Sequence, residues 1–285
     1  MEKLKLAIQK SGRLYEGTVN LLANCGLNVS GGNGKLISTV QHFPMEVLFL
    51  RDDDIPQYVQ DGVADVGIVG ENVLVEADKE VEICEKLGFS ACRLSLAVPR
   101  NTNYKDLKWF NGKHIATSYP RLLSKFLMEN KIDAQIHEIS GSVEIATGIG
   151  LADGICDIVS TGSTLLMNGL KEVETVFRSE AVLISNKTLT PLKIDLLNKF
   201  RFRLNAVKKA SSNKYVLLNA PNERLEDIFS VLPGIKSPTV LPLAIAGWSS
   251  VHSVISEVDF WEVIDRLKEK GAQGILIVPI EKMVV

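Results

Sequence analysis

A pattern of strand, glycine turn and helix occurs twice in the chain, at residues 61–70 and 153–162. The stretch Asp61-Gly-Val-Ala-Asp-Val-Gly-Ile-Val-Gly70 can be aligned with Asp153-Gly-Ile-Cys-Asp-Ile-Val-Ser-Thr-Gly162. A weaker match links Leu6–Ser11 with His114–Pro120. Two matches in the same order predict two α/β lobes that face each other, with a ligand in the cleft between them. Chance similarity between common strand–turn–helix sequences is the alternative.

The second copy of the pattern continues into a cluster of hydroxyl side chains. Ile155–Val159 is apolar and β-branched, as in a buried parallel strand, and Thr164–Leu170 can start a helix. The turn between them consists of Ser160, Thr161, Gly162, Ser163 and Thr164. Backbone N–H groups at a helix N-terminus attract an anion, and Gly162 lets the backbone approach it closely. The carboxylate of Asp157 can accept hydrogen bonds from two ribose hydroxyls. The pattern predicts a ribose 5-phosphate site; an ordinary turn capped by Ser and Thr is the alternative.

A second candidate anion site follows the first predicted strand, Leu4–Gln9. Lys10 and Arg13 flank Gly12 just before a predicted helix. This loop lies beyond the carboxyl end of a strand, where α/β sheets bind their ligands, and two cations there suit pyrophosphate or triphosphate oxygens. A pair of solvated surface charges is the alternative.

Arg51 and three consecutive aspartates follow the predicted strand Met45–Leu50. We expect Asp53 or Asp54 to cap the helix Ile55–Asp61 rather than to bind a metal. Arg51 is kept as a candidate substrate contact.

Four further residues are candidates for substrate contact. Glu71 and Asn72 follow Gly70 where Ser163 and Thr164 follow Gly162, and because a carboxylate repels phosphate, this lobe is expected to hold a base or a hydroxyl. Tyr119 precedes Pro120 at the start of a predicted helix. Glu144 either belongs to the cap of the helix that begins near Ser142 or reaches the ribose.

The composition argues against several functional classes. The 32 basic and 34 acidic residues nearly balance, which disfavours nucleic acid as a partner. The four cysteines lack metal-ligand spacing, so we expect reduced thiols and no metal cage. The four histidines are isolated in the sequence, and none is proposed as a base or ligand. No apolar run reaches the roughly 20 residues of a membrane helix, and no signal segment is evident. We therefore expect a soluble, cytoplasmic protein without a membrane partner.

The chain is long enough for two or three domains. We expect residues 1–98 and 181–212 to form the first lobe, residues 99–180 the second lobe, and residues 213–285 a terminal domain after a linker at Lys208–Asn213. The terminal segment has the predicted order βαββαβ, as in ferredoxin-like folds. It contains no catalytic cluster, so a regulatory or assembly role is expected.

Motifs spread along nearly the whole chain closely resemble the long form of ATP phosphoribosyltransferase. They are Gln9–Leu14, Leu50–Pro56, Asp65–Leu74, Cys92–Ser95, Ile115–Pro120, Gly141–Glu144, Cys156–Gly162 and the terminal Leu276–Met283. Each motif alone is weak, whereas the joint set is highly specific.

The resemblance implies the first step of histidine biosynthesis, in which ring nitrogen 1 of ATP displaces pyrophosphate from phosphoribosyl pyrophosphate with inversion. It implies an α/β, two-lobed, periplasmic-binding-protein-like (type II) catalytic core and a ferredoxin-like (ACT-like) domain that binds histidine as inhibitor. Mg2+ would enter with the substrates, and dimers or hexamers are the family's usual states.

The resemblance also assigns roles to residues. Asp157 and Ser160–Thr164 would hold the ribose 5-phosphate, with Glu144 a weaker candidate, and Lys10 and Arg13 would neutralise phosphate oxygens. Glu71, Asn72 and Tyr119 are further contacts. Thr239 and Asn219 match the family's histidine-binding positions, although some members carry an acid at the place of Asn219.

Three other functions remain to be distinguished. A solute-binding protein could share the lobes but would normally carry an export signal. A salvage phosphoribosyltransferase would use a free base instead of ATP, and an amino-acid sensor would bind histidine without turnover.

Overall fold

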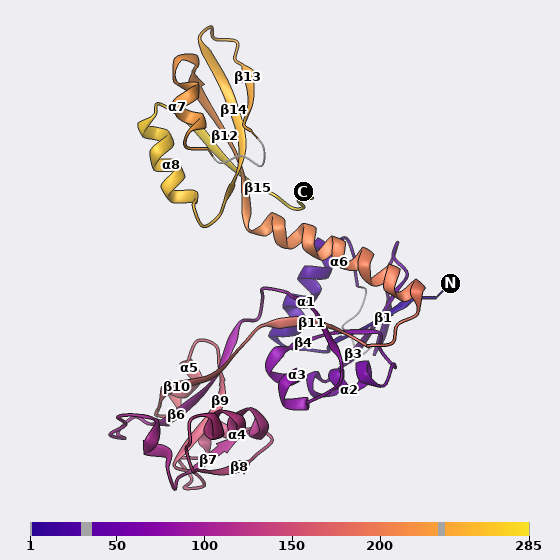
Figure 1. The fold of residues 1–285 in the computed structure, drawn as a ribbon, viewed down its shortest axis with the longest axis vertical. Coiled ribbons are helices and arrows are strands. Elements are labelled where there is room, and N and C mark those ends of the chain that lie inside the picture. The colour runs from indigo at the N-terminus through magenta and orange to yellow at the C-terminus, as the bar shows by residue number, and fades with distance from the viewer. Residues whose placement is uncertain (1, 30–35, 233–236, 285) are drawn as a thin grey trace. The chain divides into compact units, whose positions relative to one another are not determined.

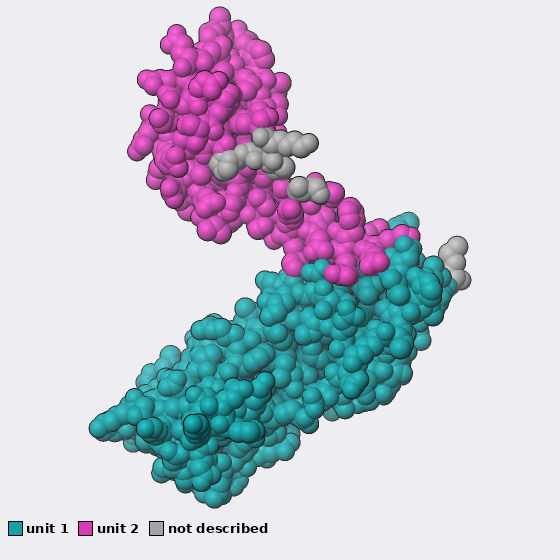
Figure 2. Space-filling view, in the orientation of Figure 1, with its two compact units in different colours: residues 1–197 teal, residues 198–285 magenta. Residues whose placement is uncertain are grey.

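The computed structural model describes residues 2–29, 36–232 and 237–284. The chain divides into two compact units, residues 1–197 and 198–285 (Figure 2). Helix α6 (Pro191–Ser211) contains the boundary between them. The first unit contains two sheets, each the centre of one lobe, and the second unit contains a third sheet.

The first lobe is built on a sheet with the strand order β2-β3-β1-β4-β11-β5. Its strands are β1 (Leu4–Gln9), β2 (Ile37–Thr39), β3 (Met45–Leu50), β4 (Val66–Gly70), β5 (Glu82–Lys86) and β11 (Ala181–Ser185). Strand β1 pairs in parallel with β3 and β4, whereas β11 runs antiparallel to β4 and β5. The helices of this lobe are α1 (Arg13–Asn24), α2 (Ile55–Gln60) and α3 (Glu71–Ala77), with a 3-10 turn η1 (Asp52–Asp54) before α2.

The second lobe has the strand order β10-β6-β9-β7-β8. Its strands are β6 (Cys92–Pro99), β7 (His114–Thr117), β8 (Gln135–Glu138), β9 (Gly154–Val159) and β10 (Leu170–Ser179). Strand β7 pairs in parallel with β8 and β9, whereas β6 runs antiparallel to β9 and β10. Helices α4 (Pro120–Glu129) and α5 (Ser163–Met167) and the 3-10 turns η2 (Leu107–Phe110) and η3 (Val143–Ile145) complete it (Figure 1).

The two sheets repeat one topology, which confirms the predicted two-lobed α/β architecture. The order β3-β1-β4-β11-β5 in one lobe corresponds to β8-β7-β9-β6-β10 in the other. In each lobe the fourth strand of this series is antiparallel and follows a segment that crosses from the other lobe. The loops after β1, β3 and β4 and those after β7, β8 and β9 therefore lie at the carboxyl ends of parallel strands, where α/β proteins bind ligands.

The structure corrects the register of the internal repeat by four residues. The backbone N–H of Asp65 donates to the carbonyl of Lys5 (2.9 Å), and the N–H of Lys5 donates to the Asp65 carboxylate (2.8 Å). Asp153 makes the same two bonds with His114, both at 2.9 Å. Asp65 thus corresponds to Asp153 and not to Asp157. The error arose because both copies have aspartates four residues apart, so that either aspartate of one copy can be aligned with the first of the other.

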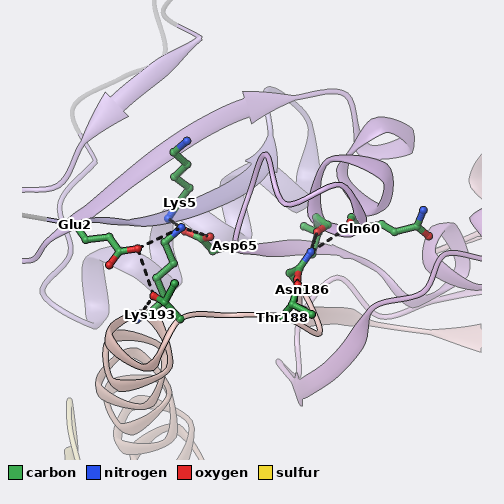
Figure 3. A network of polar contacts seen from close by, with 9 residues as sticks. Glu2, Lys5, Gln60, Asp65, Asn186, Thr188 and Lys193 are labelled. Carbon is green, nitrogen blue, oxygen red and sulfur yellow. Dashed lines mark hydrogen bonds and ion pairs between the residues drawn. The ribbon is translucent and has the colours of Figure 1, made fainter.

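Asp65 has a structural role in the first lobe. It is 3% exposed, and Lys193 of α6 places its ammonium 2.7 Å from the carboxylate (Figure 3). A buried carboxylate needs such a partner to offset the loss of hydration. In the corrected register Val69 stands where the second lobe has Asp157, and Asn72 corresponds to Ser160.

Two predicted boundaries differ from the structure. Residues 92–98, expected in the first lobe, form β6 of the second lobe, because Leu94, Leu96 and Val98 are buried in the core that contains Phe110 and Ile115. The expected linker Lys208–Asn213 is mostly helix, since α6 continues to Ser211 and β12 starts at Asn213.

The terminal sheet has the order β13-β14-β12-β15, which is that of a ferredoxin-like βαββαβ unit. Its elements are β12 (Asn213–Pro221), η4 (Asn222–Arg224), α7 (Leu225–Phe229), β13 (Thr239–Pro242), β14 (Trp248–Ser256), α8 (Phe260–Glu269) and β15 (Gln273–Pro279). Alternation along β12 and β14 buries Val216, Leu218, Val251 and Ile255 in a core that also contains residues of α7 and α8. The alternate residues, among them Tyr215, Asn219 and His252, occupy the opposite face of the sheet. Within the described ranges, no helix is both long enough and apolar enough to cross a membrane.

Candidate active site

Loops at the carboxyl ends of the parallel strands line three pockets in the first unit. The cradle pocket, about 260 Å³, is lined by Arg13, Glu144 and the stretch from Asp157 to Leu165. The central pocket, about 270 Å³, is lined by residues of both lobes, including Arg13, Asp52, Asn72, Cys92, Tyr119 and Ser160. The acidic pocket, about 420 Å³, includes Asp52, Asp53, Glu76, Tyr119 and Glu138. The predicted ribose phosphate turn is thus next to a cleft formed by both lobes.

The turn Ser160–Thr164, which we call the cradle, connects β9 to α5. Gly162 has φ +82°, and a Cβ atom there would meet only Val159 Cγ1, at 3.9 Å. A left-handed residue before the helix is readily supplied by glycine and leaves the backbone open to the pocket. The hydroxyls of Thr161 and Ser163 lie 3.0 Å apart. The cradle therefore lines the pocket with hydroxyl-bearing residues and with the start of α5, whose first amides have no partner within the helix.

Asp157 lies on β9 and lines the cradle pocket together with Glu144. Burial raises the pKa of Asp157; the backbone N–H of Ile158 lowers it, and the nearby charge of Glu144 raises it further. The Ile158 N–H donates to Asp157 Oδ1 at 2.8 Å. A partly desolvated carboxylate with unused acceptor positions is suited to bind ligand hydroxyls.

Arg13 connects the first lobe to the cradle. It begins α1 immediately after Gly12, whose φ of +91° turns the chain into the helix. Its Nη1 donates to Ser160 Oγ at 3.0 Å, and its side chain lines both the cradle and the central pockets. The Arg13 guanidinium therefore places a positive charge beside both pockets.

Arg93, on the neighbouring strand β6, supports the cradle through a hydrogen bond to its backbone, a role that the sequence reasoning missed. Its guanidinium makes two 2.5 Å contacts with the Glu172 carboxylate, and Nη1 donates to the carbonyl of Ser160 at 3.3 Å. Ser95 also donates to Glu172, at 2.8 Å. The bond from Arg93, with that from Ser95, lowers the pKa of Glu172. An arginine inside a largely apolar strand is the sequence signal that could have identified it.

Asn72 and Tyr119 meet across the central pocket. Asn72 is 6% exposed; its Nδ2 donates to the Tyr119 hydroxyl at 3.1 Å, and its Oδ1 accepts from Ser179 at 2.7 Å. Burial raises the pKa of Tyr119, with Asp52 and Asp157 contributing in the same direction. The tyrosine therefore stays neutral at physiological pH. Ser179, missed by the sequence reasoning, fixes the orientation of the Asn72 amide.

Four other predicted residues lie outside the three pockets. The loops of Lys10 and Arg51 are adjacent, since the Lys10 N–H donates to the carbonyl of Leu50 at 2.9 Å. Gly12 shapes the turn before α1, and the Glu71 carboxylate is paired with Lys86 at 2.9 Å. The cleft thus brings together most of the predicted side chains, but not Lys10, Gly12, Arg51 or Glu71.

One minor prediction is wrong. Asp54 occupies the N-cap position of α2 without a side-chain cap hydrogen bond, because the 3-10 turn η1 precedes the helix directly. His114 and His137, which are far apart in the sequence, lie on neighbouring strands with His114 Nδ1 2.7 Å from His137 Nε2.

Comparisons with known proteins agree with this geometry. Residues 51–206 match the family model described as "ATP phosphoribosyltransferase", and residues 210–282 match that described as "HisG, C-terminal domain". The chain is 58% identical to "ATP phosphoribosyltransferase" of Cytophaga hutchinsonii over 281 residues, covering 99% of this chain and 98% of the relative.

Solved structures show the same architecture. The "ATP phosphoribosyl transferase (HisG:HisZ) complex from Thermotoga maritima" aligns with TM-score 0.61 and 28% identity, covering 71% of this chain and 96% of that one. A histidine kinase sensor domain "with Similarity to Periplasmic Binding Proteins" aligns with TM-score 0.51 at 11% identity, covering 73% of this chain and 90% of that one, which concerns the fold alone. With both family models matched in order along one chain, the protein belongs to the ATP phosphoribosyltransferase family, in its long form.

Proposed function

We propose that the cradle and Asp157 hold the ribose 5-phosphate of phosphoribosyl pyrophosphate while ATP binds toward the opposite lobe. The reaction of the family, transfer of the phosphoribosyl group to ring nitrogen 1 of ATP, is the first step of histidine biosynthesis. The observation that carries the assignment is the composition of the cradle pocket. The hydroxyl-bearing cradle with its turn at Gly162, the partly desolvated carboxylate of Asp157, and Arg13 all line this one cavity. Phosphate would accept from the loop, and Asp157 would accept from the ribose hydroxyls.

Arg13 would stabilise the leaving pyrophosphate or the ATP phosphates. Lys10 and Arg51, in adjacent loops, would add further positive charge. Displacement at an anomeric carbon proceeds through an oxocarbenium-like state, so alignment and leaving-group stabilisation contribute more than a general base. Asn72 and Tyr119, neutral donors and acceptors on the wall of the central pocket, suit an adenine or ribose edge. Glu144 would lie near the ribose, beside Asp157.

Magnesium would arrive with the substrate phosphates. In the described ranges, no group of three or more His, Cys, Asp or Glu side chains is placed to hold a metal ion. Mg2+ is commonly held by one or two carboxylates and by substrate phosphates, and Asp52 and Asp53 on the acidic pocket wall could supply the former. When bound, the ion would neutralise charge on the diphosphate.

The test of this function is pyrophosphate release measured with both substrates and with each alone. The proposal requires release only when ATP and phosphoribosyl pyrophosphate are both present. Release with a free purine or pyrimidine base in place of ATP would instead indicate a salvage enzyme.

Arg13→Ala is expected to lower kcat/KM about tenfold to a hundredfold, since a charge-assisted hydrogen bond contributes about 1.5–3 kcal/mol. The side chain is exposed, so the melting temperature should change little. Initial rates and thermal unfolding measure both quantities, with Lys125→Ala on the exposed face of α4 as control. Equal rates in the Arg13 and Lys125 variants would contradict the assignment.

We further propose that residues 213–285 form the domain that binds histidine as feedback inhibitor. Asn219 and Thr239 lie on the same face of the terminal sheet, on β12 and β13, with β14 between them. On β14, His252 lies opposite Thr239 and its ring contacts the Tyr215 and Ser250 hydroxyls, each at 3.0 Å. This face offers polar groups to an amino acid.

Asn219→Ala and Thr239→Ala are expected to raise the histidine concentration for half-inhibition about fivefold or more, because each removes one hydrogen bond of about 1 kcal/mol. Ser230→Ala on the helix side of the same domain is the control. Inhibition curves and calorimetric titration with histidine provide the measurement. Unchanged curves in both variants would place the inhibitor elsewhere.

We also infer a homo-oligomer, dimer or hexamer, which light scattering of the full chain would test.

A cytoplasmic location follows from the substrates, which are made inside the cell.

A further inference from the structure

Helix α3 presents one of its faces to the second lobe. Asn72, Val75 and Glu76 have the i, i+3, i+4 spacing that places side chains on one side of a helix. Asn72 contacts Tyr119, and Val75 packs against the second lobe's core, which includes Leu122 and Leu123. A first-lobe helix therefore contributes directly to second-lobe packing.

Glu76 supplies the cap that α4 lacks locally. Tyr119, at the N-cap position of α4, makes no side-chain cap hydrogen bond. The two Glu76 carboxylate oxygens accept from the backbone N–H groups of Arg121 (2.8 Å) and Leu122 (2.9 Å). The first amides of a helix have no partner within the helix, and a negative charge there is favourable. The carboxylate of one lobe thus satisfies the helix terminus of the other.

Asp78 adds a second charge contact at the end of α3. It has a left-handed φ of +51° and forms an ion pair with the Arg121 side chain. Both side chains are well exposed, so this pair alone contributes little. Together with the other three contacts, it extends the interface along α3.

We propose that Asn72, Val75, Glu76 and Asp78 form an interlobe latch that holds the two lobes in the alignment required for catalysis, with Glu76 as its principal positioning residue. The alignment matters because Arg13 comes from the first lobe and Ser160 and Asp157 come from the second. If the lobes separate, the substrates must restore the alignment as they bind. The apparent affinity is then the affinity of the aligned form multiplied by the fraction of molecules that are aligned. The expected change in KM rests on the proposed function, whereas the expected change in hydrogen exchange of the substrate-free protein does not.

Glu76→Ala is expected to raise the KM of both substrates about threefold to thirtyfold, with kcat within about twofold of the parent. The reason is that part of the free energy lost with the helix cap favours separation of the lobes. Asp106→Ala is the matched control: Asp106 accepts from the Lys108 N–H at 2.9 Å and caps η2 entirely within the second lobe. It should lower the melting temperature without changing either KM.

Val75→Ala separates latching from direct substrate contact. Glu76 lines the acidic pocket and could touch a substrate, whereas Val75 lies outside the three pockets. Val75→Ala should also raise both KM values, about twofold to fivefold, because a core truncation at this contact weakens lobe packing. Its control is Val81→Ala, since Val81 packs against the first lobe's own core.

Hydrogen exchange of the substrate-free protein completes the test. In Val75→Ala, the amides of Arg121 and Leu122 should exchange faster although Glu76 is intact, and in Val81→Ala they should not. Unchanged KM values in both latch variants, or unchanged exchange in Val75→Ala, would overturn the proposal. A rise in one KM in Glu76→Ala alone would identify a direct substrate contact instead. If the parent protein releases no pyrophosphate with both substrates present, the proposed function is refuted, but the hydrogen-exchange result still tests the latch.

Discussion

Replacing Asp157 by asparagine is expected to lower kcat/KM for phosphoribosyl pyrophosphate roughly a hundredfold or more, since two charge-assisted hydrogen bonds contribute about 1.5–3 kcal/mol each. The amide keeps one acceptor oxygen, which can still receive the Ile158 N–H that now bonds to the carboxylate. Its NH2 group cannot accept from a second ribose hydroxyl, so the loss should fall on substrate and transition-state binding. Initial rates at varied sugar donor concentration measure the effect.

The same substitution should stabilise the folded protein at neutral pH. Burial raises the pKa of Asp157, which means that the charged form is disfavoured in the folded state. The resulting destabilisation is present above the folded-state pKa, declines as the pH falls through it, and is absent below the ordinary value of 3.8. Asparagine should therefore raise the melting temperature at pH 7, with a smaller gain as the medium becomes acidic. A variant with full activity, or one that is less stable at pH 7, would contradict the role given to this carboxylate.

Gly162→Val is expected to reduce activity about a hundredfold or more, because it places a branched side chain in a left-handed conformation on the wall of the cradle pocket. Valine there would either block the approach of phosphate to the backbone amides or force the turn into another conformation. Both outcomes remove donors from the ligand position, a loss of at least about 2.7 kcal/mol by analogy with the removal of one oxyanion donor. Steady-state kinetics and direct titration with the sugar donor measure the loss.

Gly112→Val is the matched control for this prediction. Gly112 also has a left-handed φ, +69°, and a Cβ atom added there would meet nothing within 4 Å. It lies between η2 and β7, outside the three pockets. Both variants should lose similar stability from backbone strain, but only Gly162→Val should lose substrate binding. Equal losses of activity would attribute the effect to folding rather than to the cradle.

Much of the architecture could be predicted from local sequence patterns. The apolar β-branched strands, the glycine turns and the helix after each turn are local signals, and they gave the two lobes and the ferredoxin-like unit. The cradle was equally visible, because hydroxyls, Gly162 and Asp157 lie within a few residues of one another. Arg13 was identified from the loop alone, and the structure places it against Ser160.

Long-range features were less accessible. The register of the repeat depended on which aspartate pairs with the neighbouring strand, a contact between Lys5 and Asp65 that the sequence does not encode locally. Strand β6 was assigned to the wrong lobe because the residues of a strand that crosses between lobes do not indicate which sheet it joins. Arg93 and Glu76 act through partners far along the chain, Glu172 and the start of α4, so their spacing carries no motif.

The most direct measurement is a crystal structure of the protein soaked in phosphoribosyl pyrophosphate. We expect the 5-phosphate within hydrogen-bond distance of the backbone amides and hydroxyls of residues 160–164, with the ribose hydroxyls on Asp157 and the diphosphate toward Arg13. A sugar donor bound elsewhere in the cleft, with the cradle amides turned away from it, would show that the cradle is not the sugar phosphate site.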